Sequence, residues 1–227
     1  MEHLEILRGK IISVLVFFCI STAVLFLFSE RLASFLQAPL EGLGLSLYYF
    51  RPWEKFLTYL RLAFWGGAAA SVPFAILQAA LFVWPALRQN ETRYLLFAGL
   101  VAPALFFAGA AFAYHLMAPV ALRFFLGFSP GDNVLPLWGF GEYAEFLFSL
   151  LLASGLFFQA PLLLLLSMLL GLVSPRTVAR LRPWIIMAIA FLAALLTPPD
   201  VVSQVLLGIP LYLLFELSLL IGRLLKG

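Results

Sequence analysis

The stretch Thr197-Pro198-Pro199-Asp200-Val201-Val202-Ser203-Gln204 separates two short hydrophobic runs near the end of the sequence. The first run covers residues 184–196, and the second begins at about residue 205 and carries Glu216. Two prolines and a carboxylate between short apolar helices are costly in lipid, because polar backbone groups lack hydrogen-bond partners there. A glutamate inside an apolar helix is costlier still and by default faces protein or water. This region therefore predicts two short membrane helices joined by a sharp turn, with a role other than simple anchoring.

The composition is typical of a polytopic membrane protein. Hydrophobic residues make up 64% of the 227 residues, charged residues only 11%, and the mean hydropathy is +1.07. Soluble domains of this length are far more polar, and the chain has room for about six spans of ~20 residues. We therefore expect residues 1–227 to form a single transmembrane domain. The net charge of +3 does not suggest a nucleic-acid partner, and the lone Cys19 permits no intramolecular disulfide.

The hydrophobic pattern predicts an all-α integral membrane protein with six transmembrane helices. The expected spans are residues 11–36, 56–84, 95–119, 143–170, 184–196 and 201–221. The fifth and sixth are short; the fifth gives only ~20 Å of helix against ~30 Å of hydrocarbon, so it must thin the bilayer or be shielded by its neighbours. The two long connections, about 30–52 and 120–142, contain prolines, among them Pro39, and we expect them to form structured caps.

Charged residues orient the spans. Arginine and lysine gather in the two termini and in the second–third and fourth–fifth connections, which lie on one side of the membrane: Arg8, Lys10, Arg88, Arg93, Arg176, Arg180, Arg182, Arg223 and Lys226. The opposite side carries most of the acids. The positive-inside rule then places both termini in the cytoplasm. The short tails, with no transit peptide or cleavable signal before the first span, favour a multi-pass protein of a bacterial cytoplasmic (inner) membrane.

Signals for enzymatic or metal chemistry are weak. His3 and His115 are far apart, and the sequence has neither an HExxH nor a GxSxG motif; its glycine-rich stretches lack a P-loop lysine. We therefore expect no catalytic residues, no metal and no cofactor. Asp132, Glu142 and Glu145 form an acidic patch, which is more simply explained as a solvated helix start, where acids are favourable.

Two polar residues lie deep in expected spans. Gln159 falls in the fourth span, where a lone glutamine usually makes a helix–helix hydrogen bond. Glu216 falls in the sixth, where a buried glutamate is either a functional residue or a structural bond to a neighbouring helix, and both explanations stay open. Glu91 lies in the short connection that follows Phe82 and, from its position alone, is an exposed loop charge.

Several motifs, in order along the chain, resemble the TatC subunit of the twin-arginine protein translocase. They are His3-Leu4-x-x-Leu7-Arg8, Ala38-Pro39-Leu40, Phe82-x-x-Pro85-Ala86-Leu87-x-x-x-Glu91-x-Arg93, Gly109-x-x-Phe112-Ala113-Tyr114, Phe158-Gln159-x-Pro161, Ser174-Pro175 with Arg182-Pro183, and Thr197-Pro198-Pro199-Asp200-x-x-Ser203-Gln204 with Pro210 and Glu216. The resemblance covers essentially the whole chain. Its most specific parts are the proline-proline-aspartate stretch and the connection around Glu91.

The resemblance implies a glove-shaped, concave receptor in a translocase that exports folded proteins by means of the proton-motive force. Such cargo carries signal peptides with consecutive arginines, whose guanidinium groups form forked bonds with carboxylates. Glu91 is then the expected binding residue, aided by Glu5, with Arg8 and Phe82 in the same signatures. The family has its amino-terminal acid at the position of Ile6, one residue after Glu5, and one helical step rotates a side chain by ~100°.

The resemblance also implies partners: single-span subunits of the TatA and TatB type, membrane lipid, and further copies of this chain in the assembled complex. Gln159, Gln204 and Glu216 are the expected polar contacts for partner helices. The stretch Pro198-Pro199-Asp200 forms the tip of the expected hairpin, and its aspartate caps the start of the sixth helix. The alternative function is a proton-coupled small-solute transporter that uses Asp200 and Glu216 as a relay.

Overall fold

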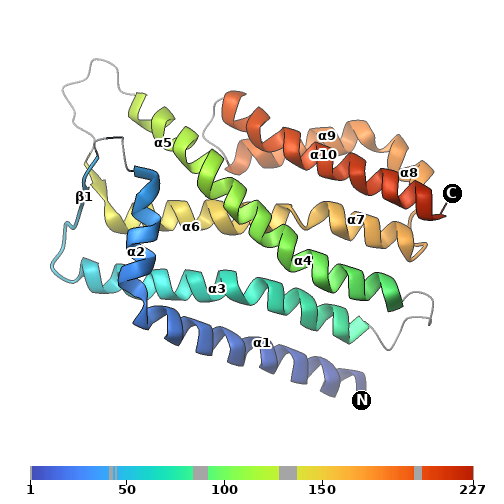
Figure 1. Ribbon diagram of the computed structural model, residues 1–227, viewed down its shortest axis with the longest axis horizontal. Coiled ribbons are helices and arrows are strands. Elements are labelled where there is room, and N and C mark those ends of the chain that lie inside the picture. Colours follow the sequence, from blue (N-terminus) through green and yellow to red (C-terminus); the bar gives the residue numbers. More distant parts are fainter. Residues whose placement is uncertain are drawn as a thin grey trace.

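Long apolar helices dominate the computed structural model, which describes residues 2–40, 43, 45–83, 92–127, 137–196 and 201–226 (Figure 1). Among these residues, five helical stretches are long and apolar enough to cross a membrane: Leu4–Leu27, Glu54–Ala79, Phe97–Gly127, Phe140–Leu169 and Gln204–Leu225. A further apolar helix, Arg182–Ala194, is shorter. The chain is therefore a multi-pass membrane protein.

The helices are α1 (Glu2–Leu27), α2 (Ser29–Gln37), α3 (Glu54–Val83), α4 (Thr92–Phe112), α5 (Ala118–Gly127), α6 (Phe140–Phe157), α7 (Ala160–Leu169), α8 (Pro175–Arg180), α9 (Arg182–Leu196) and α10 (Val201–Lys226). A 3-10 turn, η1 (Ala38–Leu40), follows α2, and a π-helical turn, η3 (Ala113–Met117), joins α4 to α5. Two short strands, β1 (Leu47–Tyr48) and β2 (Trp138–Gly139), pair in parallel.

The long helices run roughly along the longest axis of the molecule, and both ends of the chain lie at the same end of it (Figure 1). We call this the terminus end, and the opposite end, which carries β1 and β2, the strand end. α1 packs along α3, α4 packs against α6, and α10 packs against α7 and α9. α2 turns away from the direction of α1 and lies across α3 near the strand end.

Small residues allow these helices to approach closely. In α3, a Cβ on Gly67 would lie 2.1 Å from Thr22 Oγ1 and 3.0 Å from the Thr22 backbone in α1. In α4, a Cβ on Gly109 would lie 2.7 Å from Ser154 O in α6. Close backbone contact of this kind is typical of helix interfaces in membranes. The hydrophobic effect does not drive helices together in lipid, and small residues allow the tight packing that does.

The largest buried cluster lies towards the strand end. It includes Leu36 from α2 and Leu62 from α3, each 1% exposed. Tyr143 Oη donates a hydrogen bond to Leu36 O at 2.5 Å, and Tyr114 Oη donates one to Phe35 O. Because the last carbonyls of a helix have no partners within the helix, these two tyrosines, from two different spans, fix the end of α2 against the bundle.

The expected first span, residues 11–36, is divided in the structure. α1 ends at Leu27, Phe28 is not helical (φ −105°, ψ 17°), and a separate helix begins at Ser29. The second helix, α2, is short and amphipathic, with one buried side and polar residues on the other. Such a helix is typical of the end of a bundle rather than of a lipid-facing span, so the segment predicted as one span is two helices in the structure.

The described chain is predominantly helical, as expected, and contains in addition one pair of very short strands. β1 and β2 come from the two long connections and pair Leu47 with Trp138 and Tyr48 with Gly139. Pro39 lies in the same region, within η1 between α2 and β1. The connections therefore do form ordered caps in their described parts, but the link between them is a pair of strands that the sequence did not predict.

The fourth expected span, residues 143–170, contains an interruption. α6 ends at Phe157 and α7 begins at Ala160. Pro161 has no N–H and cannot bond to the carbonyl of Phe157 four residues earlier. Just before it, the backbone N–H of Gln159 donates to Leu156 O, three residues earlier, at 3.0 Å, which is a tighter turn than that of an α-helix. The break places the side chain of Gln159 where two helical segments meet.

Candidate functional site

The residues expected to bind a signal peptide lie at the terminus end, as far as they are described. Glu5 and Arg8 are both exposed on α1, and Glu5 has no ion-pair partner among the described residues. α1 is helical from Glu2 onwards and includes Glu5. The side chain of Glu5 therefore points about 100° around the helix axis from that of Ile6. Ile6 is 43% exposed, so neither direction is buried within the chain. Glu91 lies outside the described residues.

Phe82 belongs to an apolar groove between α1 and α3. The groove has a volume of about 320 Å³ and is formed by Leu7, Lys10, Ile11, Val14 and Leu15 from α1 and Ala75, Gln78, Ala79 and Phe82 from α3. Gln78 Oε1 is buried and has no hydrogen-bond partner among the described residues. The structure thus brings Phe82 together with the first turns of α1, whereas Glu5 and Arg8 lie outside the groove lining.

Gln159 is bonded within the chain. Its side chain is 6% exposed, and Nε2 donates to Ala102 O of α4 at 3.0 Å and to Gly155 O at 3.4 Å. This is the helix–helix hydrogen bond that a lone intramembrane glutamine favours. It joins α4 to the break between α6 and α7. A contact between Gln159 and a partner helix stays a prediction.

Glu216 has two partners, one of them on a neighbouring helix. Its Oε2 accepts a hydrogen bond from Arg182 Nη2 at 2.8 Å, and its Oε1 accepts one from Tyr212 Oη at 3.0 Å. Arg182 is the first residue of α9, so the ion pair joins the start of α9 to α10. The guanidinium neutralises the carboxylate, which lowers the cost of a charge in an apolar helix. Of the two explanations given above for a glutamate in this span, the structure therefore provides the bond to a neighbouring helix.

Sequence reasoning missed both partners of Glu216. Tyr212 precedes Glu216 by four residues, a spacing that places two side chains on one helix face, and this signal could have found it. The sequence indicated Arg182 as an orienting charge and as part of a family motif, not as a partner of Glu216. It is 34 residues from Glu216 in the chain, and only the packing of α9 on α10 brings the two together.

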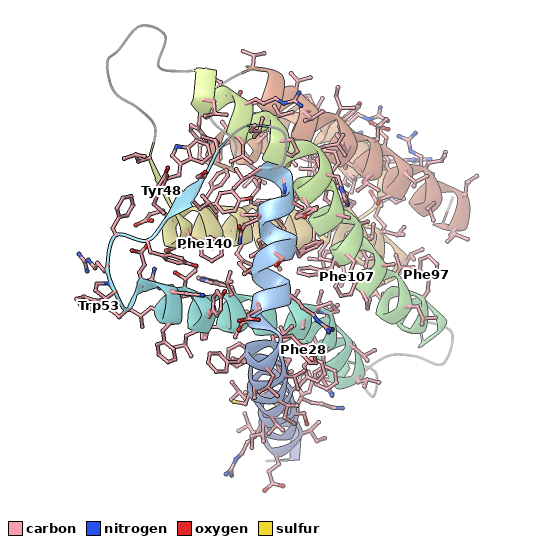
Figure 2. All side chains as sticks on the ribbon, turned by 60° about the vertical axis from the view of Figure 1, so that its left-hand side comes forward. Phe28, Tyr48, Trp53, Phe97, Phe107 and Phe140 are labelled. Atoms are coloured by element: carbon pink, nitrogen blue, oxygen red, sulfur yellow. The ribbon has the colours of Figure 1, made fainter. Side chains whose placement is uncertain are left out.

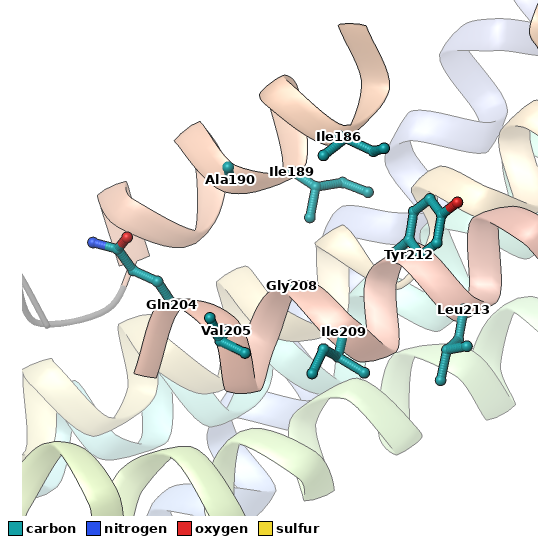
Figure 3. Close-up of a pocket in the computed structure, with 9 residues that line it drawn as sticks. All are labelled: Ile186, Ile189, Ala190, Gln204, Val205, Gly208, Ile209, Tyr212 and Leu213. Carbon is teal, nitrogen blue, oxygen red and sulfur yellow. The ribbon is translucent and has the colours of Figure 1, made fainter. Parts of the chain in front are cut away.

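A groove runs between α9 and α10 (Figure 3). Its volume is about 370 Å³, and it is lined by Ile186, Ile189 and Ala190 from α9 and by Gln204, Val205, Gly208, Ile209, Tyr212 and Leu213 from α10. Gln204 and Tyr212 lie at its two ends with apolar side chains between them. The groove therefore places expected site residue Gln204 on the same surface as the tyrosine that holds Glu216.

The hairpin residues Pro198, Pro199 and Asp200 lie outside the described residues. α9 ends at Leu196 and α10 begins at Val201, on either side of them. Pro39 lies in η1. Within the described ranges, no three histidine, cysteine, aspartate or glutamate side chains lie close enough to hold a metal ion.

Comparison with known proteins gives one consistent family. The chain matches the family model of the Sec-independent protein translocase protein (TatC) over residues 2–210. The TatC proteins of Magnetococcus marinus and Haemophilus influenzae are each 34% identical to it, over 98% and 97% of this chain and 83% and 87% of theirs. A crystal structure described as the twin arginine translocase receptor TatC in DDM superposes with a TM-score of 0.82 at 30% identity, covering 97% of this chain and 99% of that one. The chain therefore belongs to the TatC family of Sec-independent protein translocase proteins.

Proposed function

We propose that this chain is the signal-peptide receptor and core subunit of a twin-arginine translocase, which exports folded proteins using the proton-motive force. The observation that carries the proposal is the match along nearly the whole chain to a solved twin-arginine translocase receptor, in both sequence and fold. In this role the chain performs no bond chemistry of its own. It binds cargo signals and partner helices and needs no cofactor.

The proposed membrane arrangement has six spans in one transmembrane domain. α9 is the fifth span: it is 15 residues long, or about 22 Å, against ~30 Å of hydrocarbon. Both termini lie at the same end of the molecule, and the excess of arginine and lysine on that side favours the cytoplasm. The membrane is the cytoplasmic (inner) membrane of a bacterium, and the helices form a concave, glove-shaped bundle.

The proposed recognition site is at the terminus end. Glu91 binds the consecutive arginines of the signal peptide, because a carboxylate accepts forked hydrogen bonds from a guanidinium. Glu5 adds a second carboxylate that is exposed and unpaired among the described residues. Arg8 lies one helical turn further along α1, and Phe82 contributes to the apolar groove between α1 and α3, which suits apolar residues that follow the arginines.

The proposed partner surfaces are the groove between α9 and α10 and the polar residues Gln159, Gln204 and Glu216. Single-span subunits of the TatA and TatB type, and further copies of this chain, would dock there. Gln204 offers an amide at one end of an otherwise apolar groove, which suits a helix with one polar group. The tip Pro198-Pro199-Asp200 holds the α9–α10 hairpin, with Asp200 capping α10.

The transporter alternative receives no support. It requires Glu216 to take up and release a proton during transport, but the carboxylate is held by Arg182 at 2.8 Å and by Tyr212 at 3.0 Å. Both carboxylate oxygens are therefore already engaged in bonds that hold α10 to α9 and to its own preceding turn.

Cross-linking to signal peptides tests the receptor proposal. The purified full chain in lipid nanodiscs is presented with a photo-reactive peptide that carries Arg-Arg or, in a matched version, Lys-Lys. We expect Arg-Arg to cross-link more strongly and Glu91→Gln to remove that preference, while Glu30→Gln, an exposed acid on α2, leaves it unchanged. Equal cross-linking of the two peptides, or an undiminished signal in Glu91→Gln, would contradict the proposal.

A further inference from the structure

Two cavities of opposite character adjoin at the strand end. One lies between the start of α3 and the start of α6, has a volume of about 350 Å³ and is lined mainly by charged and polar groups. The other lies between α5, β2 and α6, has a volume of about 480 Å³ and is lined mainly by apolar side chains. Phe50 and Glu142 belong to both linings. We propose that this pair of cavities binds one phospholipid with a phosphoethanolamine headgroup. The proposal goes beyond the receptor role and rests only on the chain being a membrane protein.

The polar cavity presents cations that are available to a phosphate. Arg51 and Arg61 both line it. Arg61 Nη1 lies 3.6 Å from Glu145 Oε2, beyond the ~2.7–3.2 Å of a hydrogen bond, and the two side chains are 58% and 60% exposed. Arg51 has no ion-pair partner among the described residues. The guanidinium groups therefore keep N–H donors free for the forked bonds that phosphate oxygens accept.

The same cavity presents carboxylates that suit an ammonium. Glu54 is already used, because its Oε2 accepts the backbone N–H groups of Phe50 at 2.7 Å and Arg51 at 3.1 Å. Glu142 lines the cavity without such a bond in the described chain, and Glu145 lies one turn further along α6. Two arginines beside these two acids match a group that carries one phosphate and one primary ammonium. A purely anionic headgroup would meet uncompensated carboxylates.

The apolar cavity provides room for an acyl chain next to the headgroup. Its lining includes Leu122 and Phe125 of α5, Trp138 of β2 and Phe146 of α6. Phe125 and Phe146 meet edge to face at 5.8 Å between ring centroids. A polar cavity that opens into an apolar one fits an amphiphile, whereas a water-soluble phosphate ester would fill only the first.

The position along the helices also fits the lipid headgroup layer. α3 and α6 both qualify as membrane spans and begin beside the polar cavity, at Glu54 and Phe140. Exposed Trp53 lies at the same end of the molecule as Phe140 (Figure 2), as aromatic residues do at membrane interfaces. Arg61 is seven residues into α3, or about 10 Å. An exposed charge at that depth is costly in hydrocarbon unless a polar group such as a phosphate reaches it.

Lipid binding to the purified full chain tests the proposal. Native mass spectrometry measures retention of phosphatidylethanolamine, phosphatidylglycerol and phosphatidylcholine, with water-soluble glycerophosphoethanolamine as a separate arm. We expect phosphatidylethanolamine to bind about tenfold more tightly than the other two lipids and the soluble ester to bind far more weakly. Equal retention of all three lipids would overturn the proposal, and tight binding of the soluble ester would show a phosphate site without a lipid.

Variants separate the two halves of the headgroup. Arg61→Gln should lower the affinity for all phospholipids about tenfold, whereas Glu142→Gln should remove the preference for ethanolamine and leave phosphatidylglycerol binding unchanged or stronger. Glu145→Gln, at an exposed position, gives a second test of the preference should Glu142→Gln unfold. Arg123→Gln and Glu30→Gln are exposed controls outside both cavities and should change nothing. A preference that survives both acid substitutions, or an affinity that survives Arg61→Gln, overturns the assignment.

Discussion

The close contact between α4 and α6 makes Gly109→Ala an informative substitution. The added Cβ would lie 2.7 Å from Ser154 O, 2.8 Å from Phe158 Cγ and 3.0 Å from Gly155 Cα. Two of these atoms are backbone and cannot rotate away. Because non-bonded carbon atoms pack at about 3.5–4.0 Å, the two helices must separate locally by roughly 0.5–1 Å.

The expected magnitude follows from two opposing effects. Alanine is favoured over glycine inside a helix by about 0.5–1 kcal/mol, and forcing extra atoms into a packed interface costs about 1–3 kcal/mol or more. With backbone on the opposing side we expect the clash to prevail, for a net loss of about 1–2 kcal/mol in the free energy of unfolding. The separation would also lengthen the 3.0 Å bond from Gln159 Nε2 to Ala102 O, which joins α4 to the break that follows α6.

Gly208→Ala in α10 is the matched control. Its Cβ would lie 3.8 Å from Ile189 Cγ2, an ordinary contact, so only the helix preference applies and we expect a gain of about 0.5–1 kcal/mol. Unfolding of both purified variants in mixed detergent, followed by circular dichroism across an SDS titration, gives the two values. The reasoning is refuted if the free energy of unfolding of Gly109→Ala equals or exceeds that of the parent chain. It is also refuted if the two substitutions change this free energy in the same direction.

Substitutions at three further contacts can be tested by the same titration or by thermal unfolding. Tyr143→Phe removes the bond to Leu36 O and should cost about 0.5–1.5 kcal/mol, with added proteolysis at α2; a neutral result would mean that α2 is held by packing alone. Gln159→Leu should change stability by less than about 1 kcal/mol, but Gln159→Glu, which buries an unpaired charge, should be clearly more destabilising; the reverse order would contradict the bond to Ala102. Arg182→Gln and Glu216→Gln should each lower the midpoint of thermal unfolding more than the double variant does, and additive effects would show that the ion pair is not coupled.

The sequence predicts those parts of the fold that local patterns control. Apolar runs locate the long helices, and the Ser174-Pro175 start of α8 forms as such a pair suggests, with Ser174 Oγ accepting from Thr177 N at 3.1 Å. The short fifth helix also follows from the spacing of Trp184 and Leu196. The division of the first segment at Phe28 is harder to see, because Leu32 and Leu36 keep the hydropathy high while the polar residues between them make the helix amphipathic.

The remaining features depend on contacts between distant parts of the chain. The pairing of β1 with β2 involves two residues in each strand, about 90 residues apart, and so short a strand has no local pattern of its own. The Arg182–Glu216 pair spans two helices. The two cavities at the strand end arise only where α3, α5 and α6 converge. At the candidate site, Gln159 and Glu216 are bonded to residues that the sequence did not point to: Ala102, Arg182 and Tyr212.

The two ends of the molecule differ in a way that bears on its function. At the strand end, the tyrosine bonds to α2 and the β1–β2 pair tie several spans together, so a lipid seated beside them would meet a rigid surface. Towards the terminus end, α9 joins α10 through an ion pair whose members are 39% and 30% exposed, above an open apolar groove. If α9 is the fifth span, as proposed, it is shorter than the hydrocarbon is thick, so the membrane beside this groove must thin or a partner must cover it. A helix that docks in the groove would then shield both the short span and its charges, which is a physical argument for the proposal that partner subunits assemble along α9 and α10 rather than along α1.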